Sequence, residues 1–337
     1  MATRVRLDDV AKLAGVSTAT VSRVINGSSQ VRKETAQAVL TAIDTLGYDR
    51  PGFLTNPAQT AIGLVVPELI NPIFAEFAHT LQLELAHRGH PTLICSQAPG
   101  GSTEAELVET LCDNAGVAGI IFVCGRHADL QADLSQYQAL KKKGTPAVLI
   151  NGPREELDFP SVTVNYRQGV AQALAHLKSL GHRRIALVCG RDNAIPAQLL
   201  ENAFTELTTA DEELETCPII PTFYTFSGGE SAAASVKLAE ATAVIAGSDL
   251  QALGVISGLE DLGYRVPEQI SVIGFDDSTL MNHTSPALST LRQPVVAMAN
   301  AAVQLLEEQI DNAQAQSNHL TFSPDLVVRQ STAQPLN

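Results

Sequence analysis

Hydrophobic positions in the first 50 residues recur at helical spacing in three short segments. In Leu7–Ala14 most apolar residues are three or four positions apart, as on one face of a helix. Gly15 can adopt the positive φ that ends such a helix, and Ser17 is a good N-cap for a second one. A third helix is expected from Lys33 to Leu46. The pattern predicts three helices with one tight turn, which is a helix-turn-helix unit.

From residue 61 onward, continuous apolar runs of strand length alternate with amphipathic helical segments. A first series of strands is expected at Ile62–Val66, Thr92–Cys95, Ile120–Cys124 and Val148–Ile150. A second series is expected at Val162–Val164, Ile185–Cys189, Ile219–Tyr224, Ala243–Ala246 and Ile270–Phe275. Helical patterns between them include Phe74–Arg88, Gln168–Leu180 and Leu250–Leu262. Such alternation predicts two parallel sheets covered on both faces, and so two Rossmann-like subdomains.

Charge is distributed unevenly along the chain. The net charge is −14, yet residues 1–50 carry seven Lys or Arg against five Asp or Glu, which leaves −16 on the remainder. A slightly basic head on an acidic body can direct the head toward DNA while the body repels non-specific contact.

Composition places the chain among cytoplasmic proteins. No run of 18 apolar residues is present, and Met1–Asp8 has no apolar segment of the kind found in signal peptides. The five cysteines are far apart without a Cys-x-x-Cys pair, so we interpret them as reduced thiols and expect no metal site.

The outward face of the second predicted helix carries Thr18, Ala19, Ser22 and Arg23. Short side chains let a helix sit deep in a major groove, and an arginine can bind the O6 and N7 atoms of guanine with two hydrogen bonds. Hydroxyls and backbone N–H groups at the start of the helix can hold phosphates. The first 48 residues are therefore predicted to bind double-stranded DNA.

Polar and aromatic residues follow the predicted strands of the body. Because ligands bind beyond the carboxyl ends of the strands in open α/β sheets, these residues are candidates for a ligand site. The candidates are Asn71, Phe74, Gly125, Asn151, Arg191, Phe226, Asp249 and Asp276. Carboxylates and amides bind hydroxyl groups, and aromatic faces stack on the C–H surfaces of sugars. The set predicts a site for a polyhydroxylated small molecule.

Catalysis and cofactor binding are not expected. The chain has no Gly-x-Ser-x-Gly elbow, no phosphate-binding Gly-x-x-x-x-Gly-Lys loop and no His-Glu-x-x-His pair. The eight histidines are scattered along the chain.

Several segments resemble, in the same order, the lactose-repressor (LacI/GalR) family of bacterial transcription regulators, and they span nearly the whole chain. They are Leu7–Val31, which reads LDDVAKLAGVSTATVSRVINGSSQV, then Asn71–Phe74, Gly181–Ala186, Val272–Asp277 and Pro286–Leu291.

The resemblance implies a helix-turn-helix head joined to a periplasmic-binding-protein-like body, in which the chain crosses between subdomains near residues 161, 290 and 321. The expected domains are a head at 1–48, a hinge or linker at 49–60, and an effector-binding and dimerisation domain at 61–337. Its N-subdomain would hold about 61–161 plus 291–320, and its C-subdomain about 162–290 plus 321–331.

Residue roles follow from the same resemblance. Thr18, Ala19 and Arg23 match base-reading positions, and an alanine can contact a thymine methyl. Positions near phosphates are matched by Ser17, Thr20, Ser22 and Asn26. Effector-pocket positions are matched by Phe74, Phe226, Asp249 and Asp276.

One departure concerns the helix after Gly190. Many members of the family have an arginine there in an Arg-x-x-Gly-Phe pattern, whereas this chain has Leu200. The change favours a neutral effector, such as a sugar, polyol or cyclitol, over an anionic one.

A second departure lies in the linker. Pro51, Gly52 and Pro57 oppose the hinge helix that many members form here, since a proline inside a helix costs ~3 kcal/mol. Leu54 is the candidate for a side chain that wedges into the minor groove. A flexible linker and a single helical turn both fit the sequence.

We interpret the chain as a sequence-specific DNA-binding regulator, most simply a repressor, controlled by an effector between its subdomains. It would bind a near-palindromic operator as a homodimer through the helices at Phe74–Arg88 and Val295–Gln309, because two heads need adjacent half-sites. A purine- or nucleoside-responsive regulator and a sugar-binding protein without regulatory activity are the alternatives.

Overall fold

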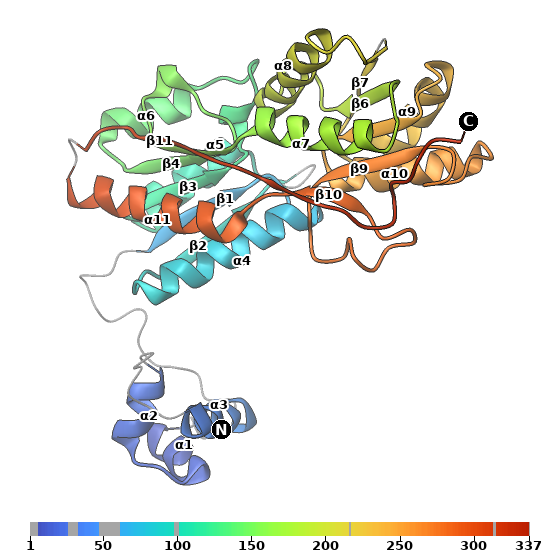
Figure 1. Ribbon diagram of the computed structural model, residues 1–337. Helices are drawn as coiled ribbons and strands as arrows, with labels where there is room; N and C mark the ends of the chain where they lie inside the picture. Colours follow the sequence, from blue (N-terminus) through green and yellow to red (C-terminus); the bar gives the residue numbers. More distant parts are fainter. Residues whose placement is uncertain are drawn as a thin grey trace. The chain divides into compact units, whose positions relative to one another are not determined.

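The computed structural model describes residues 6–25, 33–46, 61–97, 101–215, 217–312 and 315–336. The chain forms two compact units, Met1–Gln59 and Thr60–Asn337 (Figure 1). The predicted linker at 49–60, with Leu54, and the predicted phosphate contact Asn26 lie outside the described residues.

The first unit is the predicted helix-turn-helix. Its helices are α1 (Leu7–Ala14), α2 (Thr18–Ile25) and α3 (Lys33–Leu46). Gly15 ends α1 in the left-handed conformation with φ 67°, and the Ser17 Oγ accepts a hydrogen bond from the Thr20 N–H at 3.2 Å. These two features set the tight turn and start α2, as the sequence predicts.

A small apolar core holds the three helices together. Its fully buried members are Val10, Ala11, Val21, Val39 and Ala42. Leu13, which was expected on the inner face of α1, is instead 53% exposed. It lies outside the i, i+3, i+4, i+7 stripe that Leu7, Val10, Ala11 and Ala14 form.

The second unit contains two six-stranded sheets. In the first, the strand order is β11-β5-β4-β3-β1-β2 and all pairs are parallel; in the second it is β12-β10-β9-β8-β6-β7, with only β12 antiparallel. The first sheet comprises β1 (Ile62–Val66), β2 (Thr92–Ser96), β3 (Gly119–Val123), β4 (Ala147–Ile150), β5 (Ser161–Val164) and β11 (His319–Phe322). The second comprises β6 (Ile185–Cys189), β7 (Ile219–Pro221), β8 (Ala243–Ala246), β9 (Ser271–Asp276), β10 (Ser289–Arg292) and β12 (Asp325–Val327).

Helices cover both faces of each sheet. The first sheet is packed between α4 (Pro72–His87) with α11 (Val295–Asp311), and α5 (Glu104–Glu109) with α6 (Ser135–Lys143). The second is packed between α7 (Tyr166–Ser179) with α8 (Ile195–Thr209), and α9 (Phe226–Leu238) with α10 (Asp249–Asp261). Short π- and 3-10 helices lie at Thr110–Asn114, Arg126–Ala128 and Glu155–Leu157.

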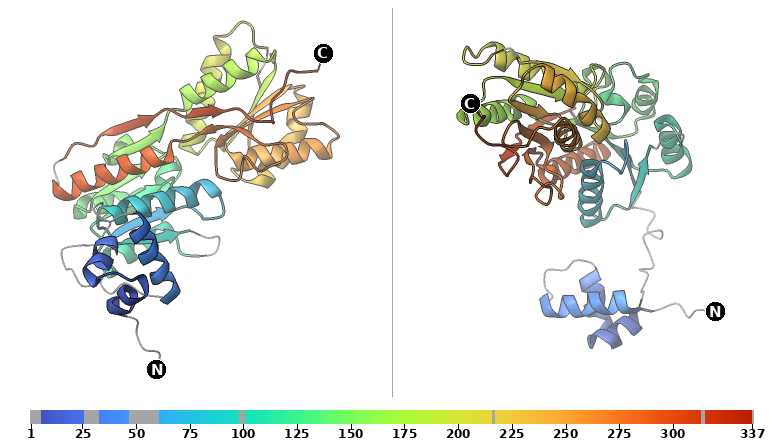
Figure 2. Two further views of the ribbon diagram at one scale, coloured as in Figure 1. Left: turned by 60° about the horizontal axis from the view of Figure 1, so that its bottom comes forward. Right: turned by 90° about the vertical axis from the view of Figure 1, so that its right-hand side faces the viewer.

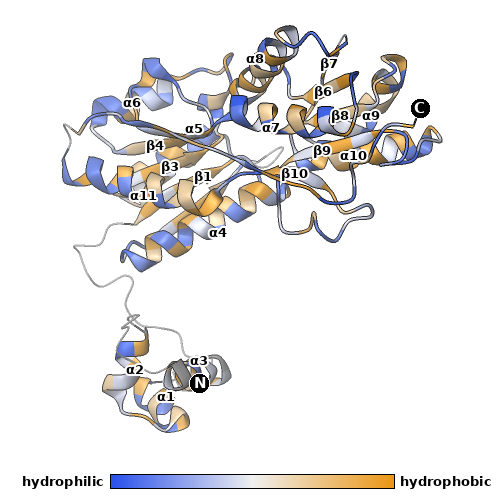
Figure 3. Cartoon of the chain, viewed as in Figure 1, coloured by the Kyte–Doolittle hydropathy of each residue, from blue (hydrophilic) through white to orange (hydrophobic). Residues whose placement is uncertain are grey.

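Side chains of one strand alternate between the two apolar cores. Ile121 and Val123 of β3 join the core under α4 and α11, whereas Ile120 and Phe122 join the core under α5 and α6. The strands therefore read as continuous apolar runs, which Figure 3 shows as hydrophobic ribbon between helices of mixed character.

Three connections join the two sheets, at β5 to α7, β10 to α11, and β11 to β12 (Figures 1 and 2). The sequence pattern placed Val162–Val164 in the second series, but β5 pairs with β4 in the first sheet. Its apolar run has the same character as the strands of either sheet, so periodicity does not say which partner it takes. The last connection brings β11, for which the sequence gave no strand signal, to the edge of the first sheet.

Two further features of the described part of the chain bear on function. None of its helices is long and apolar enough to cross a membrane. All five cysteines lie within it and none is paired with another.

The contact between α9 and α10 yields a stability prediction. A Cβ added at Gly254 would lie 1.9 Å from the Phe226 carbonyl oxygen, so the two helices approach through the missing side chain. Gly254→Ala should lower the free energy of unfolding by about 1–3 kcal/mol, the usual cost of overpacking, although alanine favours the helix. Urea unfolding checks this against Ser235→Ala, which changes an exposed residue of α9. Equal stability of the two variants would contradict the close contact.

Candidate functional site

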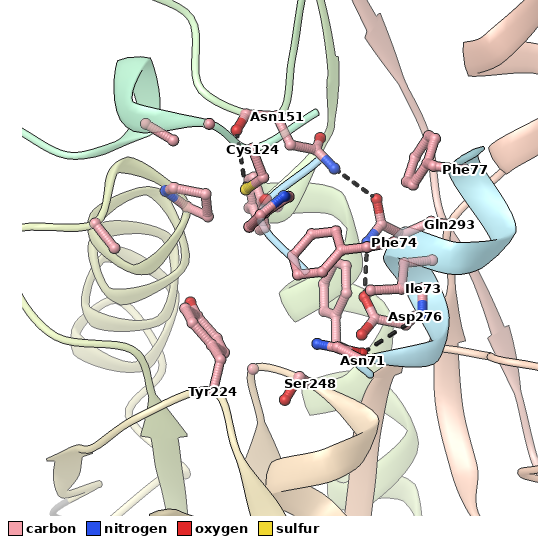
Figure 4. Close-up of a pocket in the computed structure, with 18 of the residues that line it drawn as sticks. Asn71, Ile73, Phe74, Phe77, Cys124, Asn151, Tyr224, Ser248, Asp276 and Gln293 are labelled. Atoms are coloured by element: carbon pink, nitrogen blue, oxygen red, sulfur yellow. Dashed lines mark hydrogen bonds between the residues drawn. The ribbon is translucent and has the colours of Figure 1, made fainter. Parts of the chain in front are cut away.

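A cavity of about 290 Å³ lies between the two sheets of the second unit, where parallel strands of both end (Figure 4). Residues following β1, β3 and β4 line it from one side, and residues following β6, β8 and β9 from the other. The carboxyl ends of parallel strands are where ligands bind in this class of sheet. The lining is mainly aromatic and aliphatic, with a few amide, hydroxyl and carboxyl groups.

The first sheet contributes the start of α4 to the cavity. The buried Asn71 is the N-cap of this helix, and its Oδ1 accepts a hydrogen bond from the Ile73 N–H at 3.4 Å. Capping uses the carbonyl of the amide and leaves its Nδ2 as a donor. Phe74, one turn into α4, places its half-buried ring against the cavity.

A chain of hydrogen bonds runs along the cavity from one sheet to the other. The Asn151 Oδ1 accepts from the Val164 N–H at 3.2 Å, and its Nδ2 donates to the Gln293 Oε1 at 2.9 Å. The Gln293 Nε2 in turn donates to the Asp276 Oδ1 at 2.7 Å (Figure 4). We call Asn151–Gln293–Asp276 the relay. It joins the end of β4 to the end of β9 through the segment between β10 and α11.

Two members of the relay have unusual backbone conformations. Asn151 has φ 53° and Asp276 has φ 119°, and neighbouring Cys124 and Asp277 have φ 49° and 60°. Side-chain-bearing residues rarely adopt positive φ, and each costs of order 1–3 kcal/mol. Such strain is concentrated here at the strand ends that line or adjoin the cavity.

The second sheet contributes aromatic and hydroxyl groups. Tyr224 precedes α9 and faces the cavity from the side opposite Phe74 and Asn71 (Figure 4). Ser248 caps α10 by accepting a hydrogen bond from the Gln251 N–H at 3.2 Å. Tyr166, the first residue of α7, stacks on Phe275 with ring centroids 5.5 Å apart. An apolar floor with separate polar groups suits a ligand that has both hydroxyls and C–H surfaces.

The structure brings most of the predicted ligand residues together. Those that line the cavity are Asn71, Phe74, Gly125, Asn151 and Asp276. Arg191 is exposed beside it, with its guanidinium 5.4 Å from the centre of the Phe223 ring. Phe226 is 43% exposed at the first position of α9, because β7 ends at Pro221 and not at the predicted Tyr224.

Asp249 is the third predicted ligand residue outside the lining. Its carboxylate accepts hydrogen bonds from the Ser278 N–H and Oγ at 2.9 and 3.0 Å and from the Thr290 Oγ1 at 2.6 Å. These donors lie inside the C-terminal half of the body and use both oxygens. Asp249 thus braces the segments that carry Asp276 and Gln293.

Sequence reasoning missed Gln293, Tyr224, Tyr166 and Cys124 in the cavity. A Gln-Pro pair just before a strong helix, at residues 293–294, was a usable signal for the first. Tyr224 was read as strand because aromatic residues favour strands. Tyr166 lies at a helix start and Cys124 at a strand end, so each fitted an ordinary structural role.

Burial governs the ionisation of the carboxyl groups near the cavity. Asp276 is buried, and loss of water raises its pKa well above the ordinary value; the charge of Asp249 raises it further, and the Gln293 hydrogen bond opposes both. Burial likewise raises the pKa of Asp249 to about 7 and that of the Cys124 thiol to about 12. Of the described residues that line the cavity, none is Arg, Lys or His. The cavity therefore offers no cation to an anionic ligand.

Leu200, which replaces the arginine common in the family, is buried in the core between α8 and the second sheet. The described residues also contain no group of three or more His, Cys, Asp or Glu placed to hold a metal ion.

The candidate DNA-reading face lies on α2. Ser17, Thr18, Ala19 and Arg23 are exposed, and Thr20 and Ser22 are half-buried. The Ser17 and Thr20 hydroxyls are 2.9 Å apart at the N-terminus of the helix, where backbone N–H groups favour phosphate. Val21 points into the head core from the opposite side.

The raised pKa of Asp249 predicts a pH effect on stability. Between about pH 4 and pH 7 the folded carboxyl keeps a proton that the unfolded chain has lost, so rising pH destabilises the fold. Asp249→Asn does not titrate and can still accept from Ser278. Its stability relative to the unaltered protein should rise across this range and level off above it, by about 1.4 kcal/mol per unit of raised pKa. Urea unfolding at several pH values checks this; a difference independent of pH would contradict it.

Comparisons with known proteins agree with both units. Residues 6–50 match "Bacterial regulatory proteins, lacI family", and residues 174–332 match "Periplasmic binding protein-like domain". The HTH-type transcriptional regulator MalR of Streptomyces coelicolor is 43% identical over 333 residues, covering 97% of this chain and 96% of that protein.

Solved structures give the same result. The complex of the transcriptional regulator CelR with cellobiose has a TM-score of 0.71 at 29% identity, covering 97% of this chain and 100% of that one. A LacI-family regulator from Arthrobacter sp. FB24 in complex with lactose has a TM-score of 0.69 at 26% identity, covering 81% and 100%. These relatives are transcriptional regulators and not enzymes. With its helix-turn-helix head and its body of two α/β subdomains, the chain belongs to the lacI family of bacterial regulatory proteins.

Proposed function

We propose that this protein is a cytoplasmic transcriptional repressor whose affinity for a near-palindromic operator is set by a small neutral polyhydroxylated effector. The relay carries this proposal, because it links groups in the cavity directly to a connection between the two subdomains. A ligand that bonds to the relay changes the contacts between the subdomains, which is the differential interaction that any effector needs.

The chemistry of the cavity supports a sugar, polyol or cyclitol. Its amide and carboxyl groups can bind hydroxyls, and Phe74 and Tyr224 offer ring faces to C–H surfaces. The lack of a cation among the described lining residues disfavours sugar phosphates and other anions. Relatives whose structures hold cellobiose and lactose support a disaccharide as the first compound to test.

A purine or nucleoside is the second candidate. The same two aromatic rings could sandwich a base, and the Asn71 and Asn151 amides could pair with its edge. The exposed reading face of α2 argues against the third reading, a sugar-binding protein without regulatory activity.

Control of DNA binding would pass through the subdomains to a dimer. Exposed apolar side chains on packed neighbouring elements support a homodimer face: Leu83 on α4, Leu93 and Ile94 on β2, and Val296 on α11. Closure of the subdomains around an effector would shift this face and so the spacing of two heads. Coupling of this kind is typically worth ~1–3 kcal/mol, or about 5- to 150-fold in operator affinity.

A thermal-shift screen tests the effector proposal. Sugars, polyols, cyclitols, nucleobases and nucleosides are added to the full-length protein, and hits are carried into a mobility-shift assay with an operator fragment. A true effector at 100 times its Kd should add about 2.7 kcal/mol of stability and change operator affinity. Hits confined to nucleobases and nucleosides would favour the second candidate; operator binding absent under every condition would refute a regulator.

Two variants locate the site for whichever compound binds. Asp276→Asn keeps the acceptor for Gln293 but removes the carboxyl, so it should lose most of the ligand-induced shift and still bind operator. Phe226→Leu alters an aromatic residue just outside the cavity and should keep the full shift. The reverse pattern would move the site to the start of α9.

Arg23→Ala tests the reading face of α2. If Arg23 binds guanine, its loss should cost about 1–3 kcal/mol at the specific operator and much less on random DNA. Lys12→Ala removes an equal charge from an exposed position on α1 and should weaken both DNAs alike. Binding titrations at two salt concentrations separate the effects; equal losses in both variants would assign Arg23 to phosphate contact alone.

A further inference from the structure

Two loops from different sheets meet at the rim of the cavity. Asp129 follows the 3-10 turn after β3, and Ala194 precedes α8 in the second half of the body. The two residues form an isolated antiparallel bridge, and both line the cavity. The Leu130 N–H donates to the Asn193 carbonyl at 2.7 Å, and the Asn193 Nδ2 donates to the Asp129 Oδ1 at 2.9 Å. We call residues 125–130 the fixed jaw and residues 191–194 the second jaw.

The fixed jaw is held to the first sheet by buried polar groups. Arg154, which is 7% exposed, donates from Nε to the His127 carbonyl and from Nη2 to the Asp129 carbonyl, both at 2.9 Å. Glu104 is fully buried and accepts from the Arg126 N–H at 2.9 Å. Because removing any of these partners would leave a buried charge or carbonyl unpaired, the jaw is fixed in one conformation.

Deeper groups complete this support. The Tyr137 hydroxyl accepts from the His127 N–H at 3.0 Å and itself donates to Glu104. Gln97 donates to the same carboxylate at 2.9 Å. Burial lowers the pKa of His127 to about 3, so its ring stays neutral and the network keeps its charge at ordinary pH.

The second jaw is held by contacts within its own half. Ala194 N–H donates to the Arg191 carbonyl at 3.0 Å, and Gln198 donates to the Asp192 carbonyl at 2.9 Å. Arg191 and Asp192 are exposed. The second jaw therefore keeps its local structure when it separates from the fixed jaw, and only the bridge and the two hydrogen bonds across the rim are lost.

We infer that the contact between the jaws is a latch that gates the cavity. It opens by moving the second jaw, with the second sheet, away from a fixed jaw that does not unfold. The Asn193–Asp129 side-chain bond sets how often this happens, because it adds a charge-assisted hydrogen bond to one main-chain bond. That the gated molecule is an effector rests on the proposed function; the opening itself does not.

Hydrogen exchange on the full-length protein tests the latch without any ligand. The Leu130 amide bonds across the rim, so it exchanges only when the latch opens, whereas the Ala128 amide bonds to the Gly125 carbonyl within the fixed jaw. Asn193→Ala should speed exchange at Leu130 by about 2- to 10-fold, as expected for one hydrogen bond, and leave Ala128 unchanged. Faster exchange at both amides would show that the fixed jaw unfolds, and no change at Leu130 would show that Asn193 is no latch; either result overturns the inference.

Matched variants separate the latch from a general effect on the loop. Asp192→Ala alters the neighbouring exposed side chain and should leave both amides as they are. Asn193→Asp sets a carboxylate against Asp129 and should open the latch more than alanine does. Adding Asp129→Asn restores an amide facing a carboxylate and should return Leu130 exchange toward its original rate. Failure of this double exchange to restore protection would also overturn the inference.

Discussion

The amide of Gln293 bonds at once to Asn151 at the end of β4 and to Asp276 at the end of β9. Its residue belongs to the segment that carries the chain from β10 back to α11, and all three groups are buried. A primary amide can donate and accept in the same plane, which a carboxylate or an ammonium cannot do. Much of the body depends on this constraint, because the cavity, the connection between sheets and the acid group meet in one bonded series.

The surroundings of that series explain why it can be maintained. Positive φ at Asn151 and Asp276 and the buried carboxyls of Asp249 and Asp276 all disfavour the local fold. They are offset by firm packing of four apolar cores around two parallel sheets. Asp277 adds a brace, since its carboxylate pairs with Arg292 at 2.7 Å and Arg329 at 2.6 Å, each near a different connection between the sheets. Function here is built from groups that stability alone would not select.

The fold followed closely from the sequence because its signals are local. Helical spacing, Gly15 and Ser17 predict the head, and buried apolar runs predict the strands of the body. The partner of β5 did not follow, since Val162 and Val164 are as apolar as strands of either sheet. The cavity was predicted in part. Asn71 and Asp276 lie directly after or at the end of strong strands, but Asp249 and Phe226 differ from them only in which way a helix start faces, and sequence spacing does not record that. The network behind the fixed jaw joins residues from Gln97 to Arg154 and has no local pattern at all.

The three connections between the sheets also bear on how the protein is made. The edge strand β11 pairs with β5, and β12 pairs with β10, yet both lie in the last 20 residues of the chain. While the chain emerges from the ribosome, neither half of the body can complete its sheet until translation is almost finished. Two strand edges stay open in the meantime, and open edges invite pairing with other chains. The head, whose three helices use only the first 46 residues, faces no such delay. Nascent chains should thus present a folded reading helix before they have a body able to restrain it.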